Sequence, residues 1–224
     1  MRITQNIEML EIATEGMVLH PVLVWDDKDT VLIDTILPGK LGLLEEAIAA
    51  AGKRLDDITT LILTHQDLDH VGCAKELRER GIKIMAHEIE APYLQGDKTP
   101  VRLAEMEADP GQSGRAAAIR SMAEGLYLPV DQLLTDGEVL DLAGGIRVVH
   151  TPGHMPGHIS LVLPGDIVAV GDASVSEDGK LLGPNPQFTY PQNMPEANAS
   201  LEKLLNLSPK KILCFHGGVV LMDE

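Results

Sequence analysis

The chain is poor in cysteine, in aromatic residues and in positive charge. Cys73 and Cys214 are the two cysteines among 224 residues, so no disulfide framework is expected. Lysine and arginine number 18 against 34 aspartates and glutamates, and the net charge of −16 disfavours nucleic acid and anionic membranes as partners. No apolar run is long enough to span a bilayer, and the first ten residues lack the apolar core of a signal peptide. We therefore expect a cytoplasmic protein that acts on a small molecule.

What the chain does have is enough apolar residues for a sizeable core, 44% of the total, in short segments. The pattern predicts, in chain order, a hairpin over residues 17–36, a helix over 41–51, a strand over 58–64, one helix that buries Val71, Ala74 and Leu77 and ends at Gly81, and a strand over 82–87. Short strands and one further helix, starting near Pro195, follow later. This alternation is typical of an α/β domain.

Residues 90–128 have a different composition, rich in alanine, methionine and charge, with a Pro-Gly break at 110–111. We interpret this segment as a helical insert in a single domain that covers residues 1–224. Together with the loop over 175–194 it is expected to wall a pocket and to contribute Tyr93, Phe188 and Tyr190. The same segment could instead serve as a dimer surface, so a homodimer stays open.

Polar residues of metal-ligand type follow several of the predicted strands. His65, Asp67, Asp69 and His70 occur within "THQDLDH", and alternate residues of an extended loop share one side. Ligands in open α/β structures gather at strand ends, where His154, Asp172 and His216 also lie. Imidazole and carboxylate together suit zinc, iron or manganese. His158 is expected to be a supporting or structural residue, with a role in orienting the site left open, His150 is expected to be structural, and both cysteines are expected to be core residues.

These motifs, His65-x-Asp67-x-Asp69-His70, "TPGH" at 151–154, Gly171-Asp172 and His216 before a glycine, resemble the metallo-β-lactamase superfamily over nearly the whole chain. The resemblance implies an α/β fold of the αβ/βα four-layer sandwich type with two divalent metal ions, zinc first among the candidates. Carried over by position, it implies the following ligand roles. One metal would be held by His65, Asp67 and His154, the other by Asp69, His70 and His216, with Asp172 as the bridge.

Asp67 is where the chain departs from the family pattern, since most members have histidine there and read HxHxDH. Flavodiiron proteins, a redox branch of the same fold, also carry a carboxylate at this position. An additional carboxylate makes the cluster one charge more negative and makes the harder ions iron and manganese plausible beside zinc. Replacing Asp67 with histidine is expected to shift the metal preference toward zinc if Asp67 is a ligand. If Asp67 is too short to reach the metal, it is a hydrogen-bonding residue of the loop.

Three functional hypotheses follow. The leading one is hydrolysis of an ester, thioester or lactone by a hydroxide that bridges two metals, with Asp69 as the proton acceptor and Tyr190 as a hydrogen-bond donor to the substrate. The second is a diiron oxidoreductase related to flavodiiron proteins, which would receive electrons from another protein. The third is a non-catalytic metal-binding scaffold.

Overall fold

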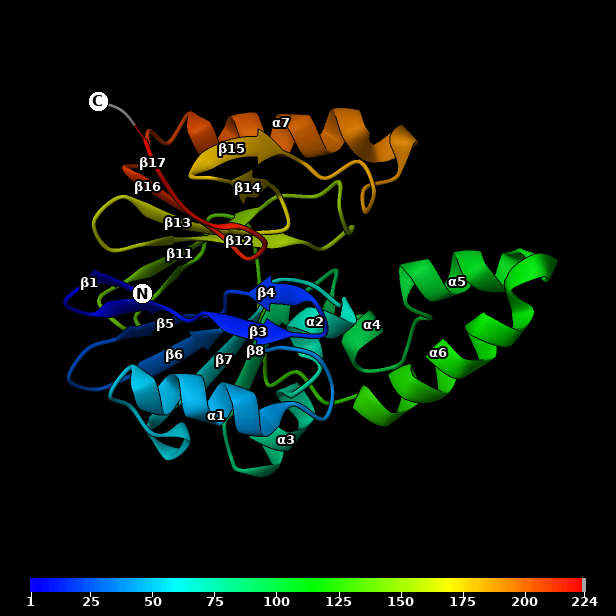
Figure 1. Cartoon of the computed structure of the whole chain (residues 1–224), viewed down its shortest axis with the longest axis horizontal. Helices are drawn as coiled ribbons and strands as arrows, with labels where there is room; N and C mark the ends of the chain where they lie inside the picture. The colour runs from blue at the N-terminus through cyan, green and yellow to red at the C-terminus, as the bar shows by residue number, and fades with distance from the viewer. Residues whose placement is uncertain (223–224) are drawn as a thin grey trace.

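Two large β-sheets form the centre of the molecule in the computed structural model, which describes residues 1–222 (Figure 1). The first sheet has the order β1-β2-β5-β6-β7-β8-β9, with strands β1 (Arg2–Thr4), β2 (Ile7–Met9), β5 (Val22–Trp25), β6 (Thr30–Ile33), β7 (Thr60–Leu63), β8 (Lys83–His87) and β9 (Gln132–Leu134). The second has the order β10-β11-β12-β13-β16-β17, with strands β10 (Val139–Leu140), β11 (Ile146–His150), β12 (Ile159–Leu163), β13 (Ile167–Gly171), β16 (Lys211–Cys214) and β17 (Gly218–Leu221).

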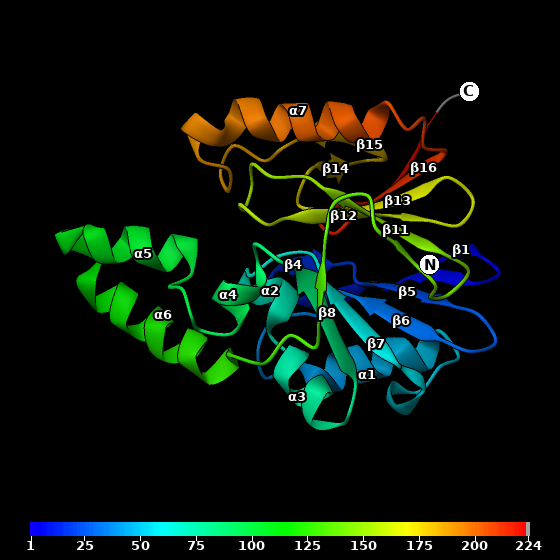
Figure 2. The ribbon, with the colours of Figure 1, turned by 180° about the vertical axis from the view of Figure 1, so that it is seen from behind.

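Helices cover the outer face of each sheet. α1 (Leu41–Ala50) and α3 (Ala74–Glu79) lie on the first sheet, and α7 (Met194–Leu205) lies on the second (Figures 1 and 2). Three apolar clusters fill the spaces between these layers. One contains Leu44 and Leu77 under the first pair of helices, one lies between the sheets, and one contains Leu204 under α7. The arrangement is the αβ/βα four-layer sandwich that the resemblance implies.

Parallel strand pairs place the candidate ligands at one edge of each sheet. β6, β7, β8 and β9 run parallel, so the segment after β7 leaves the first sheet at the carboxyl ends of its strands. β13 and β16 are also parallel, and their ends bring Asp172 and His216 to the same edge of the second sheet. Of the hairpin predicted over 17–36, the part around the acidic turn forms as β5 and β6, with Trp25 opposite Thr30, whereas Met17–Leu19 is a separate strand that pairs with Ile12–Thr14.

The single helix predicted after the polar cluster is wrong, because the structure divides it into α2 (Leu68–Val71) and α3. Gly72 lies between the two pieces against the backbone of residues 36–38. A Cβ atom on Gly72 would lie 2.3 Å from the nitrogen of Pro38, so this close approach requires glycine. Val71, Ala74 and Leu77 are nevertheless buried, as predicted.

The segment over 90–128 is helical and projects from the side of the sandwich (Figures 1 and 2). It contains α4 (Ala91–Leu94), α5 (Val101–Ala108), the 3-10 turn Pro110–Gln112 and α6 (Ser113–Leu126). We call α5, the turn and α6 the helical hairpin. Its own core is small, with Leu103, Ala116 and Ala123 as its fully buried members.

The remaining elements are short. They are the two-stranded sheets β3 (Ile12–Thr14) with β4 (Met17–Leu19) and β14 (Val175–Glu177) with β15 (Lys180–Gly183), and the 3-10 turns Leu55–Asp57 and Pro191–Asn193. None of the helices among residues 1–222 has the length and hydropathy needed to cross a membrane.

Candidate metal centre

The seven sequence-predicted metal ligands come together at the edge between the two sheets. His65, Asp67, Asp69 and His70 leave β7 and enter α2, His154 lies in the loop between β11 and β12, and Asp172 and His216 follow β13 and β16. Six of them form two groups whose ligand atoms lie within 4.8 Å of one another, namely His65, His154 and Asp172, and Asp69, His70 and His216. The structure thus brings these six residues together, and their role as ligands stays a prediction.

Asp172 connects the two groups through its two carboxylate oxygens. Its Oδ2 lies 3.4 Å from Nε2 of His154. Its Oδ1 lies 3.3 Å from Nε2 of His70 and 3.7 Å from Nε2 of His216. One oxygen thus faces each group, which is the geometry that a bridging carboxylate requires.

The donors fit a pair of cations. Among the described residues, His70 Nε2 and Asp172 Oδ1 are buried without a hydrogen-bond partner. Buried polar atoms almost always have partners, so a cation between these two would satisfy both. Burial lowers the pKa of His70, but the carboxylates of Asp172, Asp34 and Asp69 outweigh it and raise that pKa well above its usual range. The same negative potential would attract a metal ion, which would take the place of a proton on Nε2.

Asp34 and Thr64 orient the ligands from beneath, and sequence reasoning gave neither of them a role. The Asp34 carboxylate accepts hydrogen bonds from the backbone and hydroxyl of Thr64, at 2.8 and 2.7 Å, and lies 2.9 Å from Nδ1 of His70. The carboxylate fixes Nδ1 as the protonated nitrogen and leaves Nε2 free for a metal. The only sequence signal was that Asp34 ends an apolar strand in "VLIDT".

His158 supports the bridge from the second sheet, in agreement with the supporting role expected of it. Burial lowers its pKa well below the usual range, as do the neighbouring histidines, so the ring is neutral. Its Nε2 accepts the backbone N–H of Asp172 at 3.0 Å, and its Nδ1 lies 2.9 Å from the hydroxyl of Thr151. His158 therefore holds the backbone of Asp172 in place without touching either group of ligands through its nitrogens.

Glu90 joins the two ligand loops and was also missed by the sequence reasoning. Its buried carboxylate accepts hydrogen bonds from the backbone and side chain of Gln66, at 2.9 and 2.8 Å, and from the backbone of Gly157 at 3.0 Å. Gln66 lies between His65 and Asp67, and Gly157 precedes His158. Glu90 thereby fixes the distance between the first loop and the loop that carries His154. No motif marks it in the sequence.

Replacing Glu90 with glutamine is expected to remove a pH dependence of stability. Burial raises the pKa of Glu90 to about 7, more than its hydrogen bonds lower it. The folded protein keeps this proton to higher pH than the unfolded chain, so the stabilisation present below the unfolded pKa is lost as the pH rises through about 7. Urea unfolding at about pH 5 and about pH 8 should show wild type losing roughly 3 kcal/mol that the glutamine variant does not lose. The exposed neighbour Glu88→Gln is the control and should behave as wild type; equal slopes in all three proteins would contradict the prediction.

Asp67 is held by an arginine of the helical hairpin. Nε of Arg102, on α5, donates to Oδ2 and Oδ1 of Asp67 at 2.9 and 3.1 Å, and a terminal nitrogen of Arg102 donates to the carbonyl of Phe188 at 2.8 Å. Oδ2 of Asp67 also lies 3.2 Å from Nε2 of His154 and 3.6 Å from Nε2 of His65. Burial raises the pKa of Asp67, but hydrogen bonds with His154 and His65 outweigh it and hold that pKa well below the usual range. Asp67 is therefore an anion shared between the histidines and Arg102.

Tyr190, the predicted hydrogen-bond donor to the substrate, lies next to Arg102, with its ring centroid 5.9 Å from the guanidinium carbon. Burial and a hydrogen bond with Glu105 raise the pKa of its hydroxyl to about 12. Its catalytic role stays a prediction. His150 stacks on His87 with ring centroids 4.4 Å apart, and Cys73 and Cys214 are buried, as expected for structural residues.

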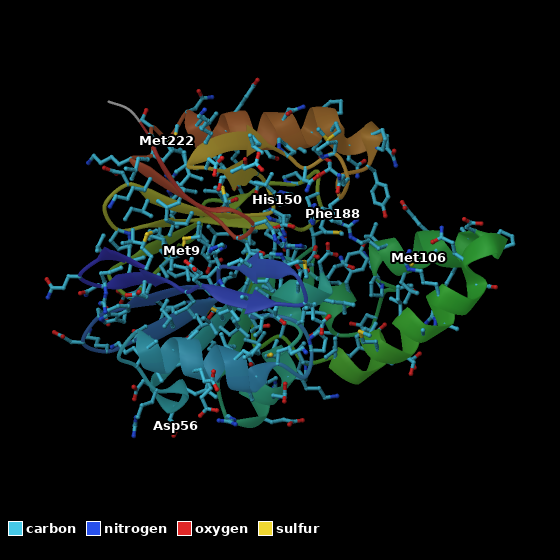
Figure 3. All side chains as sticks on the ribbon, viewed as in Figure 1. Met9, Asp56, Met106, His150, Phe188 and Met222 are labelled. Carbon is cyan, nitrogen blue, oxygen red and sulfur yellow. The ribbon has the colours of Figure 1, made fainter. Side chains whose placement is uncertain are left out.

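A cavity of about 870 Å³ opens beside the two groups of ligands. The polar side of its wall includes Asp67, Asp69, Asp172 and His216. The predicted pocket residues Tyr93 and Phe188 also line it, and most of the opposite wall comes from the helical hairpin. Phe188 lies on the side of the sandwich that faces the hairpin, and Met106 lies on α5 (Figure 3).

Comparison with known proteins agrees with this geometry. Residues 20–216 match the family model of the metallo-beta-lactamase superfamily. The chain is 32% identical to YobT of Bacillus subtilis over 97% of this chain and 91% of that protein, and 30% identical to the probable metallo-hydrolase YflN of the same organism over 84% and 75%. It is 32% identical to the hydroxyacylglutathione hydrolase GloC of Haemophilus influenzae over 70% of this chain and 66% of that protein.

Solved structures show the same fold. A metallo-beta-lactamase family protein of Thermus thermophilus superposes with a TM-score of 0.80 at 24% identity, covering 98% of this chain and 76% of that one. The family match, the four-layer sandwich and the two groups of histidine and aspartate at its edge agree on the class. The chain belongs to the metallo-beta-lactamase superfamily, as a metal-dependent hydrolase.

Proposed function

We propose that the protein hydrolyses an ester, thioester or lactone at a site that holds two divalent metal ions. The observation that carries this proposal is the position of Asp172, whose two oxygens face the two groups of ligands. When bound, the two ions would bring the pKa of water near neutrality and polarise the substrate carbonyl. The name of the relative GloC, which is a hydroxyacylglutathione hydrolase, supports including thioesters among the substrates.

Asp69 is the proposed proton acceptor. Its carboxylate lines the cavity and is 21% exposed, so it can reach the attacking water. Nε2 of His216 lies 3.2 Å from Oδ2 of Asp69 and fixes the orientation of that carboxylate. Asp69 would take the proton from the water and return it to the leaving oxygen or sulfur as the tetrahedral species collapses. Arg102 and Phe188 line the same cavity.

We include zinc as the native metal in the proposal. Asp67 adds one negative charge relative to the histidine of the common HxHxDH pattern, and Arg102 adds one positive charge beside it. The pair has no net charge, so the total charge of the cluster is that of one with a neutral histidine, although the donor atom at this position is still an oxygen. Arg102 therefore compensates the charge that would favour iron or manganese, but not the oxygen donor. A reducing cytoplasmic location is part of the same proposal.

The diiron oxidoreductase is the second candidate, because the carboxylate at position 67 is the feature that flavodiiron proteins share. Iron in the native protein together with oxygen uptake would support it. The charge that Arg102 supplies to Asp67 argues against it, since that charge cancels the additional negative charge of the cluster and leaves only the oxygen donor in favour of iron. The non-catalytic scaffold would require bound metal without turnover.

Elemental analysis together with a substrate panel tests the proposal. Protein purified without added metal should contain about two divalent ions per chain, predominantly zinc, and removal of these ions by a chelator should abolish turnover. The panel should contain aryl esters, acyl thioesters and lactones, and we expect cleavage of at least one class, restored when zinc is added back. Two bound ions with no hydrolysis of any class would count against the hydrolase, and iron with oxygen uptake would replace it by the second candidate.

A further inference from the structure

We propose that the cavity beneath the helical hairpin binds the aliphatic acyl chain of the substrate, and that the protein prefers medium or long acyl chains to acetyl groups. This inference rests on the proposed hydrolysis and adds the substrate class. It depends on the position of the cavity, on the chemistry of its walls and on the place of Arg102 at the boundary between them.

The cavity is continuous with the catalytic residues. Asp69, Asp172 and His216 form part of its wall, so a carbonyl group placed at the metal centre would have its substituent inside the same space. The volume of about 870 Å³ is near the upper end of the range usual for small-molecule sites, and it is far larger than an acetyl group needs. The site therefore has room for a long substituent.

The walls away from the metal centre are mostly apolar. They include Leu68, Leu94, Leu103, Met106, Ile119 and Leu126, while the exposed Arg115 of α6 adds one charged side chain to the lining. Most of this surface offers no partner to a polar substituent, which would lose its hydration there. A hydrocarbon substituent binds favourably in the same place, because each methylene group that it buries is removed from water.

Part of the apolar surface of the helical hairpin faces the cavity. Met106, Ile119 and Tyr127 pack against its small core and are only partly buried, and all three line the cavity. Met106 is flexible and unbranched, and methionine adapts its shape to apolar ligands of different length. The hairpin therefore supplies the wall that an acyl chain would complete.

Arg102 lies where the polar and the apolar parts of the cavity meet. It bonds Asp67 on the side of the metal centre and the carbonyl of Phe188 on the other. Its guanidinium carbon is 6.0 Å from the Phe188 ring. The guanidinium is fixed by these partners and keeps the charged part of the site separate from the hydrocarbon wall.

A series of p-nitrophenyl esters with acyl groups from acetyl to dodecanoyl tests this inference with the leaving group held constant. The metal-loaded enzyme should show kcat/KM rising about fourfold for each added methylene until the cavity is filled. Met106→Trp, which narrows the cavity, should lower kcat/KM for the dodecanoyl ester at least about tenfold more than it lowers kcat/KM for the acetyl ester. Met122→Trp is the matched control, because Met122 lies on the same hairpin with 47% of its surface exposed.

Calorimetric titration with straight-chain alcohols gives a second measurement that does not require turnover. Octanol and decanol should bind wild type and Met122→Trp more tightly than butanol does, whereas Met106→Trp should lose this gain. If no ester is cleaved but the alcohols bind in this order, the hydrolysis proposal fails and the chain site stands. A rate independent of chain length, an equal effect of both tryptophan variants, or sedimentation showing that a second copy covers the hairpin would overturn the inference.

Discussion

Replacing Asp172 with asparagine is expected to reduce hydrolysis at least about a thousandfold and to lower the bound metal from two ions per chain to one or none. The two oxygens of Asp172 face histidine nitrogens of different groups, so its replacement should weaken metal binding at both groups. Asparagine keeps the shape of the side chain but removes its charge. One half of the amide is an N–H donor, which cannot bind a cation. Metal content by elemental analysis and kcat/KM on the best substrate of the panel measure the effect.

The fold should survive this substitution. Asp172 is buried among histidines. Burial raises its pKa, but the charge of His70 lowers it by more, so the pKa of Asp172 lies well below the usual range. The backbone of Asp172 is held separately by His158. Circular dichroism should therefore be unchanged. Asp166→Asn, in an exposed turn where Asp166 pairs with Lys210, is the control and should retain both metal and rate. Full activity of Asp172→Asn would mean that the two groups do not work as one centre.

Much of this site could be predicted from the sequence because its residues follow strands. The segment "THQDLDH" comes directly after β7, and His216 follows β16, so the position of each strand fixes the position of its ligands. The alternation of strands and helices predicted an α/β domain for the same reason, and the sandwich itself was implied by the resemblance to the family. His158 could be separated from His154 because only one of them occupies the position matched by the family motif.

The residues that control the ligands could not be predicted in this way. Arg102 reaches Asp67 from a helix 35 positions later, and Glu90 reaches Gln66 across 24 positions. Neither belongs to a motif, and contacts of this kind depend on how the helical hairpin packs against the sandwich. The break at Gly72 was missed because its cause, the backbone at Pro38, is distant in sequence. Local periodicity contains no information about such contacts.

The Asp67–Arg102 pair changes what a substitution at Asp67 would mean. Histidine at position 67 would meet the guanidinium of Arg102 instead of a carboxylate, so Asp67→His alone would add a destabilising contact to any change in metal preference. The expected shift toward zinc should therefore be measured in the double variant Asp67→His with Arg102→Gln. The two residues have to be examined together.

A double-mutant cycle on Asp67 and Arg102 should decide whether Asp67 is a metal ligand. Arg102→Gln removes a positive charge whose terminal nitrogen lies 3.3 Å from Nε2 of His154, so zinc affinity should rise about tenfold. Asp67→Asn should lower the affinity at least about tenfold in wild type.

The informative comparison is Asp67→Asn in the Arg102→Gln background. If Asp67 binds the metal, the loss of affinity persists there, and this is the result we expect because Oδ2 of Asp67 lies near the nitrogens of both His154 and His65. If Asp67 only neutralises Arg102, the loss disappears once the arginine is gone. Competition with a zinc chelator gives the four affinities. Arg120→Gln, which breaks an exposed pair with Glu107 on the same hairpin, should leave all of them unchanged and so separates charge at the site from damage to the hairpin.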